Sequence, residues 1–90
     1  MIYSQPSFTR RYSRLAFQKR LRVDAAIARL ESAFGRPHLH AGVGIRPFGR
    51  YLELRVGLDL RVLFLPEGGD LFLICVGNHD EIRSYVKGNS

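Results

Sequence analysis

Arginine, histidine and tyrosine residues in the second half of the chain could together carry out chemistry on a phosphodiester. Arg55 and Arg61 flank a short turn signal, and His79 precedes Tyr85 by six residues. A guanidinium can hold a phosphate through two parallel hydrogen bonds, and an imidazole titrates near neutral pH. Metal-free RNA cleavage needs a base for the ribose 2′-hydroxyl, an acid for the leaving 5′-oxygen and cations for the pentacovalent phosphate. These four residues are the candidate catalytic groups.

The two arginines are expected to face each other across a β-hairpin. Apolar residues alternate along 51–56 and again along 60–64, with a three-residue loop between the two runs. Pairing residue 56 with residue 60 places Arg55 opposite Arg61, a like-charge pair that costs about 0.2–1 kcal/mol unless a carboxylate or another anion balances it. Glu53, diagonal to Arg61, could provide that balance in an ordinary, partly exposed ion network. The alternative is a phosphate site.

A C-terminal helix is expected to carry His79 and Tyr85. Asn78 and Glu81 have the spacing of an N-cap residue and its capping-box partner. The strand before this helix should end beside the start of the strand that holds Arg61, which brings His79 toward the arginines. Six residues correspond to about 9 Å of helix rise, so Tyr85 could approach the same rim. The structural alternatives are a hydrogen-bonding histidine at a helix start and a core aromatic.

Two further features could have carried chemistry. His38 and His40 alternate along the chain and could bind zinc together with His79, or they could belong to a polar loop. We expect no metal site and no other cofactor. Cys75 stands among apolar residues and is expected to be an inert core thiol, because a reactive thiol needs an exposed, electropositive site.

Two N-terminal helices are expected after a short first strand. Pro6-Ser7 marks a helix entry, after which apolar residues recur with the spacing of one helical face. A second, longer helix is predicted from Phe17 to Phe34, where Gly35 and Pro37 supply the stop. The predicted inward-facing residues are Phe8, Tyr12 and Leu15 of the first helix and Val23, Ile27, Leu30 and Phe34 of the second.

After His40 the apolar period changes from 3.6 to 2, and glycines separate short segments rich in Leu, Val, Ile and Phe. This pattern predicts an antiparallel sheet. Residues 71–76 are apolar without alternation, which indicates a central strand covered on both faces. With the N-terminal strand and the hairpin, the sheet has four predicted strands. Its predicted core residues are Leu54, Val62, Phe64, Ile74 and Val76.

The composition describes a small, basic, globular chain. Its 90 residues suffice for one domain, 1–90, and 46% hydrophobic with 24% charged residues excludes intrinsic disorder. The net charge of +6 predicts an anionic partner, and 12 of the 14 basic residues are arginine, a bias that codon usage could also produce. The sequence shows no signal peptide and no apolar run long enough for a membrane helix. We therefore expect a cytoplasmic protein without a membrane partner.

The order and spacing of these motifs resemble those of the RelE/ParE superfamily of bacterial toxins from toxin–antitoxin systems. The matching segments are YLELRV at 51–56, LRVLF at 60–64 and VGNHDE at 76–81 followed by Tyr85, with Ser7-Phe8 opening the helical pair. The resemblance covers nearly the whole chain. It implies an α+β fold in which two N-terminal helices pack on a twisted, mostly antiparallel four-stranded sheet with a short C-terminal helix.

The same resemblance implies a toxin that cleaves messenger RNA, alone or on the ribosome, inhibits translation and binds an acidic antitoxin. It implies Arg61, His79 and Tyr85 as catalytic residues. With Arg55, which faces Arg61, these form the predicted catalytic set, and Arg50, Arg55 and His40 are the predicted RNA-binding residues. Several ribosome-dependent relatives have lysines where this chain has Leu52 and Leu54, so the base must come from elsewhere, for example from His79 or His40. The alternatives are a ParE-type inhibitor of DNA gyrase and a degenerate toxin that only binds its antitoxin.

Overall fold

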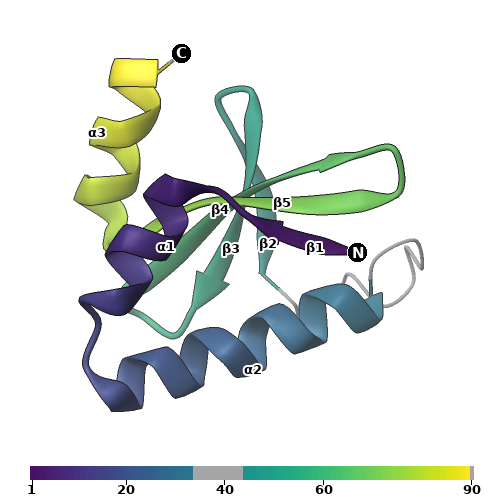
Figure 1. Ribbon diagram of the computed structural model, residues 1–90. Helices are drawn as coiled ribbons and strands as arrows, with labels where there is room; N and C mark the ends of the chain where they lie inside the picture. Colours follow the sequence, from purple (N-terminus) through teal and green to yellow (C-terminus); the bar gives the residue numbers. More distant parts are fainter. Residues whose placement is uncertain (34–43, 90) are drawn as a thin grey trace.

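Three helices and five strands make up the computed structural model, which describes residues 1–33 and 44–89 (Figure 1). In chain order the elements are β1 (Ile2–Ser4), α1 (Pro6–Ser13), α2 (Phe17–Ala33), β2 (Ile45–Phe48), β3 (Tyr51–Val56), β4 (Leu60–Glu67), β5 (Asp70–Gly77) and α3 (His79–Asn89). None of the helices in these two ranges combines the length and the apolar character needed to cross a bilayer.

The strands form one mixed sheet in the order β1-β5-β4-β3-β2. The prediction of four strands was wrong by one, because β2 pairs with β3 and adds a fifth. β2 has only four residues, and Arg46 and Pro47 at its centre break the apolar alternation that identifies a strand. Proline is tolerated in an edge strand because its missing N–H removes no ladder bond there. β1 pairs with β5 in parallel, while the other pairs are antiparallel.

The β3–β4 hairpin has the predicted register. Val56 pairs with Leu60, Leu54 with Val62 and Leu52 with Phe64, which places Arg55 opposite Arg61. All three apolar pairs pack in the core beneath α1 and α2.

The sheet carries α1 and α2 on one face and α3 on the other (Figure 1). β5 lies between β1 and β4, as expected for a central strand covered on both faces. Its lack of alternation has a second cause, because the ladder with β4 shifts register after the pair Leu63–Cys75 and leaves Ile74 as an extra residue. Both Ile74 and Cys75 pack in the core beneath α3. Burial raises the pKa of the Cys75 thiol, in agreement with a structural role.

The helices differ from prediction in which residues they bury. α1 ends at Ser13, so Leu15 packs against the core from the connection that follows the helix. On α2 the side chain of Ile27 is only half-buried, and Ala26 is buried in its place. The small alanine side chain lets the helix approach the sheet closely. Phe34, Gly35 and Pro37 lie outside the described residues; the buried residues of α2 are Val23, Ala26, Leu30 and Ala33.

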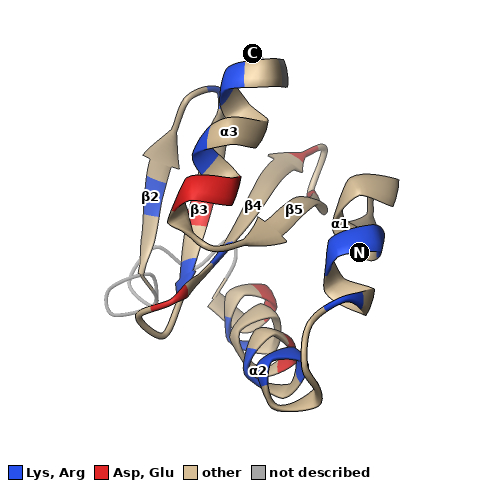
Figure 2. Ribbon diagram, turned by 90° about the vertical axis from the view of Figure 1, so that its left-hand side faces the viewer, with Lys and Arg blue, Asp and Glu red and all other residues tan. Residues whose placement is uncertain are grey.

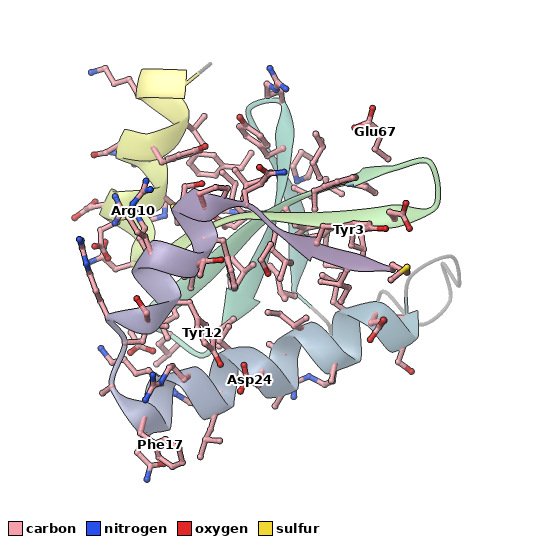
Figure 3. The ribbon with its side chains drawn as sticks, viewed as in Figure 1. Tyr3, Arg10, Tyr12, Phe17, Asp24 and Glu67 are labelled. Carbon is pink, nitrogen blue, oxygen red and sulfur yellow. The ribbon has the colours of Figure 1, made fainter. Side chains whose placement is uncertain are left out.

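Polar contacts fix the two helices and the hairpin relative to one another. The Tyr12 hydroxyl on α1 donates a hydrogen bond of 2.6 Å to Asp24 on α2, and Figure 3 shows the two side chains meeting between the helices. Arg22 on α2 forms two hydrogen bonds of 2.9 and 3.0 Å with Asp59 in the β3–β4 turn. This pairing lowers the pKa of Asp59. These hydrogen bonds hold the β3–β4 turn, which brings Arg55 and Arg61 together, against α2.

Candidate functional site

Glu53 is the centre of the charged cluster on the sheet face that carries α3. Its side chain is only 2% exposed. Its Oε1 atom accepts a hydrogen bond of 2.8 Å from Nε of Arg46 on β2 and lies 3.5 Å from Nε of Arg61 on β4. The ion network that was one alternative at this position does form, with Glu53 itself buried and the Arg46 side chain 52% exposed. Sequence reasoning misses Arg46 because it predicts no strand at β2.

The two facing arginines have different environments. The Arg61 side chain is 15% exposed, and its Nη1 donates a hydrogen bond of 3.0 Å to the carbonyl of Leu60. Arg55 is exposed, and its side chain has no ion pair with any residue in the described ranges. Arg46, Arg55 and Arg61 carry three positive charges and Glu53 carries one negative charge, which leaves +2. This excess is the electrostatic signature of an anion site.

The N-terminus of α3 is built by a capping box. The backbone N–H of Asn78 donates to Oε1 of Glu81, and the backbone N–H of Glu81 donates to Oδ1 of Asn78, each at 2.8 Å. A Cβ atom at Gly77 would lie 2.9 Å from Glu81 Oε1, so a larger residue there would displace this carboxylate. Arg11 of α1 reaches Glu81 Oε2 at 3.2 Å. These contacts fix the start of α3, of which His79 is the first residue.

His79 packs against β2. Its ring meets Phe48 edge-on with centroids 6.2 Å apart, and the Arg46 guanidinium lies 6.0 Å from the centroid of the same Phe48 ring. Arg83, one helical turn further along α3, lies with Nη2 3.3 Å from His79 Nε2. Because a guanidinium can only donate, Nε2 acts as the acceptor in this contact. The i, i+4 spacing could have revealed Arg83 from the sequence, whereas the role of Phe48 depends on β2.

Tyr85 lies in a second region, at a pocket of about 460 Å³ on the same sheet face. The Tyr85 ring is 6.4 Å from the Tyr51 ring, and the Arg50 guanidinium lies 5.3 Å from the centroid of Tyr51. Phe72 and Ile74 of β5 add apolar lining. Figure 3 shows Glu67, another lining residue, beside the β4–β5 hairpin.

The arrangement of charges follows the elements. Figure 2 shows Lys and Arg positions on β2, β3 and α3. Tyr51 and Arg55 stand four residues apart on β3, a separation of about 13 Å along a strand. The charged cluster and the aromatic pocket are thus neighbouring parts of one face.

Solved structures of toxins have the same architecture. The toxin structures include the RelB–RelE antitoxin–toxin complex from Methanococcus jannaschii, with a TM-score of 0.70, 16% identity and coverage of 92% of this chain and 96% of that chain. YafQ from Escherichia coli gives a TM-score of 0.68 with 20% identity, covering 91% and 96%. The YoeB–YefM toxin–antitoxin complex from Staphylococcus aureus gives 0.64 with 16% identity, covering 88% and 95%. This chain has the RelE/ParE toxin fold.

No protein-family model and no curated protein matches the sequence. The RelE/ParE resemblance inferred from the motifs is thus confirmed through the fold that the chain shares with these toxins.

Within the RelE/ParE fold, the candidate residues separate into two groups. Arg55 and Arg61 face each other, and Arg61 pairs with Gly77, two residues before His79, so the backbones of these three lie at one end of the sheet. Tyr85 and Arg50 instead line the pocket. His38 and His40 lie outside the described residues. Among the residues that are described, no three histidine, cysteine or acidic side chains are grouped as metal ligands.

Proposed function

We propose that this protein is the toxin of a toxin–antitoxin pair and that it cleaves messenger RNA without a metal ion. The observation that carries the proposal is the cluster of Arg46, Arg55 and Arg61, with its excess of two positive charges, at the sheet end where α3 begins with His79. Cations and a proton-transferring imidazole are the groups that phosphodiester cleavage through the 2′-hydroxyl requires. The RelE/ParE fold supports the toxin role.

In the proposed reaction, Arg61 and Arg55 hold the scissile phosphate. The ribose 2′-oxygen attacks phosphorus as its proton is taken up, the bond to the 5′-oxygen breaks, and that oxygen receives a proton. The products are a 2′,3′-cyclic phosphate and a 5′-hydroxyl end. His79 acts as general acid or base, and the two guanidinium groups stabilise the charge that develops on the phosphate oxygens.

The aromatic pocket would receive a base next to the scissile phosphate. Tyr51 and Tyr85 provide rings for stacking, and Arg50 provides a cation at the pocket. Exposed bases of single-stranded RNA commonly stack on aromatic side chains and on guanidinium planes. In this arrangement Arg50 and Arg55 contact RNA, and Tyr85 is a stacking platform or the partner of His79 in proton transfer. His40, the third residue of the predicted RNA-binding set, keeps the status of a sequence prediction.

A cleavage assay with purified protein tests the proposal. The chain should cut a single-stranded RNA, either alone or once ribosomes are added, and leave cyclic phosphate ends. An RNA with 2′-deoxyribose at the cleaved position and an all-DNA analogue should both remain whole, because each lacks the attacking hydroxyl. Addition of a chelator should not change the rate, since arginines and His79 supply the chemistry.

The alternatives predict different outcomes of induced expression in bacteria. Growth arrest with intact transcripts and inhibited DNA supercoiling would favour a gyrase inhibitor and contradict the ribonuclease. Continued growth, together with binding of an antitoxin, would indicate a degenerate toxin.

An acidic antitoxin is the proposed protein partner. The RelB–RelE and YoeB–YefM structures are toxin–antitoxin complexes. This chain carries +6 and exposes large apolar side chains on α2, where Phe17 is 62% and Leu21 47% exposed. Figure 3 shows Phe17 at the start of that helix. A basic, partly apolar surface suits an acidic segment that folds on binding.

Binding to such an antitoxin should weaken as salt increases, because mobile ions screen the attraction between a +6 chain and an acidic partner. Titration calorimetry between about 0.05 and 0.5 M NaCl measures the effect, and the dissociation constant should rise across this range. An affinity that stays constant over the series would show that electrostatic attraction contributes nothing to the complex.

A further inference from the structure

Glu53 is a buried charged residue that the proposed reaction does not use. Its side chain is 2% exposed, and its Oε2 atom is buried without a hydrogen-bond partner in the described part of the chain. A buried carboxylate is costly to desolvate, and leaving one of its oxygens unpaired adds about 1–3 kcal/mol. An apolar residue on this strand would avoid both costs. The contacts with the neighbouring arginines offset part of this cost, so the role of Glu53 lies in what it does to those arginines.

The contacts of Glu53 show which groups it can act on. Oε1 accepts the Arg46 Nε–H at 2.8 Å and lies 3.5 Å from Arg61 Nε, so one oxygen orients two guanidinium groups from the strands on either side. Arg61 uses Nη1 on the carbonyl of Leu60. With Nε near Glu53 and Nη1 near Leu60, the guanidinium plane is held from two directions while Nη2 has no hydrogen bond within the described residues.

We infer that Glu53 is a positioning residue that holds Arg61 in the orientation needed to bind the phosphate of RNA. The inference rests on the proposed function for the identity of the anion. The physical reason is that a displacement of about 1 Å in a group that binds the transition state can cost about 10²-fold in rate. A freely rotating arginine would bind phosphate but would not present its hydrogen bonds to the developing charge.

Direct proton transfer by Glu53 is the competing role, since a carboxylate can serve as a base. Burial argues against it, because a group with 2% exposure is covered by its neighbours and cannot touch a ribose hydroxyl in this conformation. The two roles differ in their effect on the pH–rate profile. A base gives a limb that disappears when the carboxylate is removed, whereas a positioning residue leaves the shape of the profile unchanged.

A double-mutant cycle on RNA cleavage tests the inference. Glu53→Gln keeps the shape and one acceptor oxygen but loses the charge. We expect kcat to fall about 10–100-fold with an unchanged pH profile, while KM stays constant or decreases because the site becomes more positive. In an Arg61→Ala background the same change should cost less than about 2-fold, because Glu53 then has no catalytic arginine to orient.

Glu31→Gln on α2 is the matched control, since it removes one exposed negative charge from a different surface. It should leave kcat within about 2-fold of wild type if the effect of Glu53→Gln comes from the charge beside Arg61 and not from the net charge of the chain. An equal loss from Glu53→Gln in both backgrounds, an unchanged kcat or a lost pH limb would each overturn the inference.

A second readout keeps this inference separate from the proposed function. The Arg61 Nε–H resonance, assigned as the signal that Arg61→Lys removes, should exchange with water about tenfold faster in Glu53→Gln, since a charge-assisted contact is lost. If wild-type protein fails to cut RNA, the ribonuclease proposal falls and this exchange rate still decides whether Glu53 orients Arg61. An unchanged exchange rate would show that Glu53 does not hold that guanidinium.

Discussion

Replacing Arg61 by Ala is expected to reduce RNA cleavage by about 10²–10³-fold, the scale for removing one donor that stabilises transition-state charge. Arg61 is the more restrained of the two facing arginines, with 15% exposure and contacts to Glu53 and the Leu60 carbonyl. Arg55 across the ladder is exposed and should contribute less. Single-turnover cleavage of a labelled RNA measures the effect as a change in the rate of the chemical step.

The effect of this substitution on folding differs from what sequence alone indicates. Removal of one of two facing arginines should relieve repulsion, yet Arg61 also approaches a carboxylate that is 2% exposed. Glu53 keeps the 2.8 Å hydrogen bond from Arg46, so the variant should still fold with a loss of about 1–3 kcal/mol in the free energy of unfolding. Denaturant unfolding checks this value.

Two further variants separate charge from geometry at this position. Arg61→Lys keeps the charge but loses the planar fork, so most of the cleavage should still be lost. Arg29→Ala removes an exposed arginine from α2 and should leave cleavage unchanged. Full activity in Arg61→Ala would contradict the proposed role of the facing arginines.

The hairpin was predictable because two independent constraints agree on one register. A shift by one residue would turn the apolar side chains of 51–56 and 60–64 to the opposite face, and the three-residue loop allows only the pairing of Val56 with Leu60. The facing arginines follow from that register. The capping box of α3 was predictable because it depends only on local sequence: the side chains of Asn78 and Glu81 each accept a hydrogen bond from the backbone N–H of the other.

β2 was not predictable by the same reasoning, and most of the charged cluster depends on it. Its four residues include Arg46 and Pro47, and the strand forms because β3 offers an edge to pair with. β3 begins only two residues after β2 ends, but the pairing that makes β2 a strand leaves no periodic signal within its own four residues. The contact between Glu53 and Arg46 was missed for the same reason, because the hydrogen bond of 2.8 Å that Arg46 donates to Glu53 exists only where β2 pairs with β3.

The separation of Tyr85 from the arginines also depends on tertiary geometry. Helix rise predicts how far Tyr85 lies along α3 but not how the helix crosses the sheet. In the structure α3 places His79 against Phe48 and Tyr85 near Tyr51, so the two candidates face different parts of the same sheet. The crossing is set by close packing, for a Cβ atom at Gly49 would lie 2.9 Å from Val86.

Replacing His79 by Gln is expected to lower cleavage by about 10²–10⁴-fold, the range for losing general acid–base catalysis. Glutamine can still accept the hydrogen bond that Arg83 offers at 3.3 Å, but its amide cannot transfer a proton near neutral pH. The variant should therefore bind RNA as tightly as wild type while the chemical step slows. RNA anisotropy and single-turnover rates measured across a pH series distinguish these two quantities, and the pH limb due to His79 should vanish.

Asp80→Asn is the matched control for His79→Gln, because it changes the exposed neighbouring residue in the same helical turn and should leave the rate within about 2-fold.

Tyr85→Phe tests the role of Tyr85, since it keeps the ring for stacking and removes only the hydroxyl. A smaller loss than in His79→Gln would assign Tyr85 to base stacking, and an equal loss would assign it to proton transfer with His79. If His79→Gln and Tyr85→Phe both retain full toxicity in cells whose transcripts stay whole, the protein does not act as a ribonuclease, and inhibition of gyrase takes its place as the proposed activity.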